Sequence, residues 1–135
     1  MNKMERQLRE VQNKLMRGLL DLVILQFLKS HPMHGYQIIS SIRKNFGVYF
    51  GPSTIYPLLS LLEEKGYVES NWDLTNQRPR KVYTLTGEGE GLLSCTEDSL
   101  SIICHKLASI GMGKVSLNDI FGKHIGVTVK GPNGR

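Results

Sequence analysis

Histidine pairs are the first residues to consider for chemistry, because imidazole nitrogens bind transition metals and transfer protons near neutral pH. His31 and His34 flank Pro32, but no cysteine or carboxylate lies near enough in the sequence to complete a metal site. His105 follows Cys104 directly, and neighbours on a helix point about 100° apart, so this thiol and imidazole would not face each other. We therefore expect no metal and no catalytic dyad, and we interpret His31 and His34 as capping and packing residues.

Carboxylates and glycines indicate neither acid–base catalysis nor nucleotide binding. Glu63 and Glu64 are adjacent near the end of an expected helix whose apolar residues lie elsewhere, which favours exposure to solvent. Residues 47–51 lack the lysine of a phosphate-binding loop. At residues 87–91 glutamates alternate with glycines, and the negative charge of the glutamates would repel a phosphate. We predict a protein that is not an enzyme and holds no cofactor.

The two cysteines, Cys95 and Cys104, would point about 180° away from each other on one helix. This direction excludes a disulfide between them within one helix. We interpret each as a small buried thiol, and disulfide pairing between two chains stays open as the alternative.

A cluster of cations is the clearest chemical signal. The chain carries a formal net charge of +5, which favours polyanions such as nucleic acid or acidic lipid. Arg78, Arg80 and Lys81 surround Pro79, which cannot donate a hydrogen bond within a sheet. We expect this basic tip to project into solvent, where its cations can contact phosphates.

Two strands and a preceding helix are expected to position the basic tip. Residues 67–74 and 81–85 are rich in aromatic and β-branched side chains, which predicts a hairpin. We expect Trp72 and Tyr83 to stack across it. Before the hairpin, Ser53 is expected to cap a helix with a buried apolar stripe, ending at Lys65 and Gly66. The other face of that helix presents Ser53, Tyr56, Pro57, Ser60 and Glu64.

Three further helices are expected before this one. Apolar residues three and four positions apart predict a helix over residues 2–17, which Gly18 interrupts. Residues 19–28 are apolar on nearly every side and predict a helix at the centre of the core. The third helix is expected over residues 36–46, with Gly47 as its stop.

Thr86 is expected to cap a last helix that carries a seven-residue apolar repeat. Because such a seam exposes apolar surface, we predict that it packs against a second subunit, and packing onto its own domain is the alternative. The apolar stripe of residues 2–17 is predicted to join this interface. The expected dimer residues are Met4, Leu8, Val11, Leu15, Leu93, Leu100, Ile103, Leu107 and Ile110.

Helices followed by a hairpin with a basic tip are typical of a winged helix-turn-helix protein, mainly α with a small β-hairpin. In this fold one helix enters the major groove and the hairpin contacts the backbone beside it. The corner at residues 51–54 is expected to hold a phosphate on the free amides of a helix N-terminus. The sequence therefore predicts a partner of double-stranded DNA. The expected DNA-binding residues are Tyr36, Ser53, Thr54, Tyr56, Pro57, Ser60, Arg78, Arg80 and Lys81.

Three ordered motifs closely resemble the PadR family of transcriptional regulators, namely residues 32–38 (PMHGYQI), 54–68 (TIYPLL to LEEKGYV) and 78–86 (RPRKVYTLT). The resemblance implies a winged-helix repressor that binds a palindromic operator as a homodimer and is released by a small-molecule effector. It also implies that Tyr36, Thr54, Tyr56 and residues 78–81 face DNA. The chain departs from the family pattern at Ser60 and Leu61, which stand where relatives commonly carry basic residues. The last helix is also short, as in the compact branch of the family.

The expected organisation is an N-terminal amphipathic helix (1–17), a winged-helix domain (18–86), a dimerisation helix (87–110) and a glycine-rich basic tail (111–135). One short strand is expected within the tail at residues 124–129. No apolar run is long enough to span a membrane and no signal peptide is evident, so we expect a cytoplasmic protein. A winged-helix adaptor that binds another protein is the alternative function.

Overall fold

The computed structural model describes residues 1–112 of the 135-residue chain. Within the described part, Met1–Ser94 form one compact unit, and a second unit begins at Cys95. Most of the expected tail, including the short strand expected at residues 124–129, lies outside the described residues.

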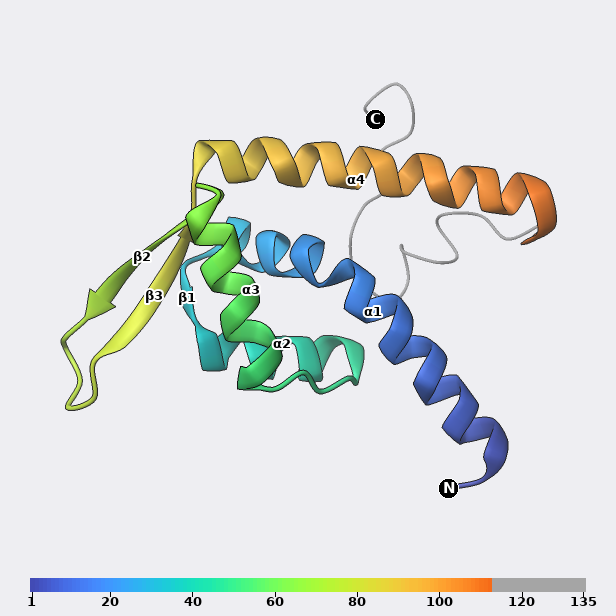
Figure 1. Ribbon diagram of the computed structural model, residues 1–135, viewed down its shortest axis with the longest axis horizontal. Coiled ribbons are helices and arrows are strands. Elements are labelled where there is room, and N and C mark those ends of the chain that lie inside the picture. The colour runs from blue at the N-terminus through green and yellow to red at the C-terminus, as the bar shows by residue number, and fades with distance from the viewer. Residues whose placement is uncertain (113–135) are drawn as a thin grey trace. The chain divides into compact units, whose positions relative to one another are not determined.

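The described residues form a mainly helical fold with one small antiparallel sheet, so the predicted fold class is confirmed. Figure 1 labels the elements in chain order. They are α1 (Lys3–Ser30), β1 (Met33–His34), α2 (Gly35–Phe46), α3 (Pro52–Glu64), β2 (Val68–Asp73), β3 (Arg80–Leu85), α4 (Gly87–Leu107) and a π-helical turn (Ala108–Met112).

Helix α1 is continuous through Gly18, so the predicted interruption there is wrong. One glycine inside a helix costs only about 1 kcal/mol relative to alanine, and good helix formers on both sides outweigh that cost. The helix begins at a capping box in which the Asn2 side chain accepts from the Glu5 backbone N–H, and the Glu5 side chain accepts from the Asn2 backbone N–H. Its second half is the predicted core helix, with Leu20, Leu22, Val23, Ile24, Leu25 and Leu28 buried.

Helices α2 and α3 begin at different kinds of cap. His34 caps α2 in a capping box with Gln37, and Gly47 ends it in the left-handed conformation (φ 70°) as predicted. Helix α3 is capped by Gly51 and not by Ser53, which corrects the predicted start. Pro52 occupies the first helical position, where its missing N–H removes no helical hydrogen bond.

The predicted hairpin is confirmed as β2 and β3, and β1 adds a third strand that the sequence analysis did not predict. The strand order is β1-β3-β2. Trp72 lies opposite Lys81, whereas Tyr83 lies opposite Ser70, so the predicted stacking of Trp72 on Tyr83 is wrong. The Lys81 ammonium instead lies 5.6 Å from the centre of the Trp72 ring, while Tyr83 is buried in the core.

The start of α4 is fixed against the end of the α3–β2 connection. The Thr86 hydroxyl donates to the Gly66 carbonyl and accepts from the Gly89 backbone N–H, which confirms Thr86 as the cap. A Cβ at Gly89 would overlap the Tyr67 carbonyl, so only glycine allows this approach. Leu93, one turn further on, is 1% exposed within its own chain. Leu93 is therefore a core residue, and its predicted place in a dimer seam is wrong.

The two cysteines lie on the part of α4 that belongs to the second unit. Cys95 is exposed, so the prediction of a buried thiol is wrong at this position. Cys104 is half-buried, and this burial raises the pKa of its thiol, which disfavours the reactive thiolate.

Candidate nucleic-acid interface

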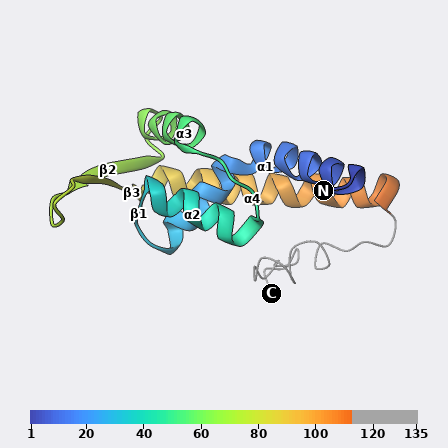
Figure 2. The same ribbon diagram turned by 90° about the horizontal axis from the view of Figure 1, so that it is seen from below.

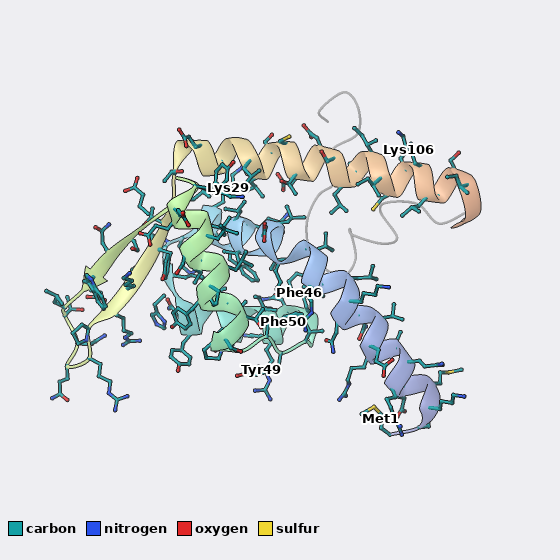
Figure 3. All side chains as sticks on the ribbon, viewed as in Figure 1. Met1, Lys29, Phe46, Tyr49, Phe50 and Lys106 are labelled. Atoms are coloured by element: carbon teal, nitrogen blue, oxygen red, sulfur yellow. The ribbon has the colours of Figure 1, made fainter. Side chains whose placement is uncertain are left out.

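The start of α3 is an open helix N-terminus. No side chain caps it, and Pro52 and Ser53 are exposed to solvent. Pro52 has no N–H, and the Thr54 and Ile55 N–H groups donate to the Gly51 carbonyl, so this end offers an anion the Ser53 N–H and the helix dipole. Figure 3 shows Phe50 and Tyr49 on the connection that leads into it, with Phe50 buried and Tyr49 largely exposed. Phe50 anchors this connection beneath the Arg17 guanidinium, whose carbon lies 5.3 Å from the centre of the ring.

The outward face of α3 carries short polar and apolar groups and no cation. Ser53, Pro57 and Ser60 are exposed, and Thr54 and Tyr56 are half-buried beside them. The opposite face buries Ile55, Leu59 and Leu62, so α3 cannot turn this polar face inward without exposing the core. Hydroxyl groups of this kind hydrogen-bond base edges or phosphates, and short side chains allow the helix backbone to approach a groove closely.

Tyr36 of α2 and Tyr56 of α3 meet on this face. Their ring centres are 6.4 Å apart in an edge-to-face arrangement. The Tyr56 ring lies against the Gly35 backbone, where a Cβ would overlap it. Burial, and secondarily the neighbouring Tyr36, raise the pKa of Tyr56, so its hydroxyl keeps its proton at neutral pH and can donate.

The basic tip of the hairpin, which we call the wing, projects away from the helices in Figure 1. Arg78, Arg80 and Lys81 are all exposed there. The Asp73 carboxylate fixes the turn by accepting hydrogen bonds from the Thr75 hydroxyl (2.6 Å) and backbone N–H (3.0 Å), and these bonds lower the pKa of Asp73. The wing thus presents its cations on a turn held by local hydrogen bonds.

A contact that the sequence analysis missed joins the wing to α2. Arg80 Nη1 lies 2.9 Å from Nε2 of His34, the residue that caps α2. Only the pairing of β1 with β3 reveals this contact, because 46 positions separate the two residues. Arg80 and His34 connect the wing to α2, and Tyr36 and Tyr56 connect α2 to α3. One side-chain contact therefore joins the wing to α2, and another joins α2 to α3.

Figure 2 shows α3 and the hairpin from a second side, with α3 at the margin of the first unit.

Among residues 1–112, no group of three metal-ligating side chains is close enough to hold an ion. Across the same residues, no helix combines the length and apolarity needed to cross a membrane.

Apolar side chains predicted to form a dimer are mostly exposed, apart from the buried Leu93. On the first half of α1, Met4, Leu8, Val11 and Leu15 are all more than half exposed. On α4 and the turn after it, Ile103, Leu107 and Ile110 are more than half exposed, and Leu100 is half-buried. Each set is an apolar surface that its own unit leaves open to solvent.

Comparison with known proteins places this arrangement in a family. The family model described as "Transcriptional regulator PadR-like family" matches residues 24–94, which contain α2, α3 and the wing. The chain belongs to the PadR-like family of transcriptional regulators. The resemblance of the three sequence motifs is thereby confirmed, and the fold is the winged helix of that family.

Two solved structures illustrate the relation. A PadR family transcriptional regulator from Eggerthella lenta is 28% identical, with a TM-score of 0.70 over 82% of this chain and 93% of that one. PadR of Bacillus subtilis, solved in complex with operator DNA, is 29% identical, with a TM-score of 0.53 over 56% of this chain and 45% of that one. A Lysinibacillus sphaericus protein named "Uncharacterized protein X" is 31% identical over 87 residues, which are 62% of this chain and 80% of that protein.

Proposed function

We propose that this PadR-like chain is a repressor that binds a palindromic DNA operator as a homodimer. The observation that carries the proposal is the open N-terminus of α3, which has a face rich in hydroxyl groups. Contacts of Tyr36 with Tyr56 and of His34 with Arg80 join this helix, through α2, to the basic wing. The complex of Bacillus subtilis PadR with operator DNA supports the proposed operator binding by this chain.

In the proposed complex α3 enters the major groove and the wing follows the adjacent backbone. A groove about 12 Å wide admits a helix, and the exposed Ser53 and Ser60 let the helix approach the base edges. Because α3 itself carries no cation, the phosphate contacts come from its N-terminus and from the wing. This division assigns base recognition to α3 and most of the salt-dependent affinity to Arg78, Arg80 and Lys81.

A homodimer is proposed because two apolar surfaces are open to solvent, on the first half of α1 and on the second half of α4. A two-fold dimer presents two α3 helices and so favours an operator with two symmetric half-sites about one helical turn of DNA, or a multiple of it, apart. Release by a small-molecule effector completes the proposal, and it rests on the family resemblance.

Selection of bound fragments from genomic DNA tests the proposal. We expect recovery of an inverted repeat whose half-sites are spaced by about 10 base pairs or a multiple of that. A duplex with the same composition in shuffled order is the control, and we expect it to bind at least about a thousandfold more weakly. Equal recovery of all fragments, or of none, would contradict operator binding and would favour the adaptor function.

A further inference from the structure

His34 lies where β1, α2 and the wing meet. Its backbone pairs with Val82 of β3, and it is the N-cap of α2. Nδ1 of its ring lies 3.3 Å from the backbone N of Gln37, and Nε2 lies 2.9 Å from Nη1 of Arg80. Both ring nitrogens therefore face a hydrogen-bond donor.

The two donors compete for the same ring. A neutral imidazole accepts through one nitrogen and carries hydrogen on the other, so His34 accepts either from Gln37 or from Arg80 at any moment. The bond from Arg80 is charge-assisted and is the shorter of the two. A protonated ring accepts from neither donor and repels the Arg80 guanidinium.

The surroundings of the ring favour its neutral form. The charged groups that face it are Arg80 on β3 and Asp73 on β2, and α2 contributes the uncharged Gln37. Burial and Arg80 lower the pKa of His34, and Asp73 opposes them. At neutral pH the ring can therefore act as an acceptor for Arg80.

We propose that His34 is a positioning residue for DNA binding, whose neutral ring accepts from Arg80 Nη1 and holds the guanidinium at the base of the wing, with its other N–H groups directed to a DNA phosphate. A side chain already held near its bound position loses less conformational freedom when it binds. The proposal rests on the proposed DNA binding, and it adds that the contribution of Arg80 depends on the protonation of His34.

Two substitutions separate the roles of the ring. In His34→Asn the amide oxygen takes the place of Nδ1, and asparagine is a favoured N-cap, so the α2 cap is kept and the contact with Arg80 is lost. In His34→Gln the longer side chain brings its oxygen to the place of Nε2, so the contact with Arg80 is restored. Neither amide titrates, so both variants lack the protonation step.

The first test needs no DNA. The pKa of the His34 ring is measured by NMR in the free wild-type protein, in Arg80→Gln and in Asp73→Asn. We expect Arg80→Gln to raise this pKa and Asp73→Asn to lower it, because the first removes a repelling charge and the second an attracting one. If the pKa of His34 is the same in Arg80→Gln as in the wild type, the two side chains do not interact and the positioning role is wrong.

The second test is a double-mutant cycle on a DNA fragment recovered by selection. We expect Arg80→Gln to weaken wild-type affinity about tenfold at pH about 7.5, and by a smaller factor at a pH below the ring pKa measured in the first test, where the ring is protonated. In the His34→Asn background we expect Arg80→Gln to weaken DNA affinity by only about twofold to threefold, and by the same factor at both pH values. In the His34→Gln background we expect the loss to return to about tenfold at both pH values.

Two outcomes would overturn the positioning role alone. The first is that Arg80→Gln weakens DNA affinity by the same factor in the wild type and in His34→Asn. The second is that the factor measured in the wild type does not change with pH. Thermal unfolding of His34→Asn checks that the cap and the fold are intact. Failure of the wild-type protein to bind any selected fragment would instead overturn the proposed function, while the NMR test would still report the contact.

Discussion

Gly35 and Tyr56 show how one residue without a side chain can set the shape of a binding face. The Tyr56 ring occupies the place that a Cβ at residue 35 would need, and the ring also packs edge-on against Tyr36. A methyl group at residue 35 would push Tyr56 away and disturb the contact between α2 and α3.

We therefore expect Gly35→Ala to lower the free energy of unfolding by about 1–3 kcal/mol, the cost of overpacking a tight contact. Urea denaturation measures this change. Gly18→Ala is the matched control, because a Cβ at Gly18 in α1 meets nothing within 4 Å. That control should raise the free energy of unfolding by about 0.5–1 kcal/mol. A Gly35→Ala protein as stable as the wild type would contradict the close packing.

Single residues with local partners could be predicted from the sequence, and residues with distant partners could not. Thr86 as a cap and Gly47 as a stop act on their own turn of helix, so their types are sufficient evidence. The partner of Trp72 depends on the register of the hairpin, which pairs it with Lys81. The contact of His34 with Arg80 requires the pairing of β1 with β3, and a strand of two residues leaves no periodic pattern in the sequence.

At the scale of elements, the helices and strands predicted within residues 1–112 are present, with the first two helices joined as α1, but the boundaries between elements differ. Gly18 does not divide α1, because the flanking residues favour helix strongly enough to outweigh one glycine. The N-cap of α3 lies two residues before the expected cap, because Gly51 and Pro52 together form a start that does not need a side-chain cap. The face of α3 predicted to meet DNA is exposed in spite of this shift.

The wing as an element is expected to supply salt-dependent affinity. Each phosphate contact contributes about 0.9 to the slope of log K against log salt concentration, so Arg78→Ala combined with Arg80→Ala should reduce the slope by about 1.8. Fluorescence anisotropy at several salt concentrations measures it. Arg6→Ala combined with Arg9→Ala removes the same charge from exposed positions of α1, where we expect no contact with DNA, and should leave the slope unchanged. Equal slopes for the wing variant and the wild type would count against phosphate contact by the wing.

At the scale of the whole molecule, the exposed apolar surfaces of α1 and α4 make the homodimer a testable part of the account. We expect Ile103→Asp to convert the dimer to monomers, because it places a charge in an apolar interface. Ile103 is more than half exposed in the single chain, so the substitution should leave the fold intact. Sedimentation velocity measures the result, with Ser99→Asp as a control of equal charge on an exposed polar position. If the Ile103→Asp protein is still a dimer, Ile103 does not lie in the interface.

The central claim is that the open start of α3 faces a DNA phosphate, and Ser53→Asp tests it most directly. An aspartate in the first turn favours the helix, so the fold should be retained, but its charge would repel a phosphate at that position. We expect operator affinity to fall about tenfold to a hundredfold, with Ser99→Asp binding like the wild type. Wild-type affinity in a folded Ser53→Asp protein would contradict the account.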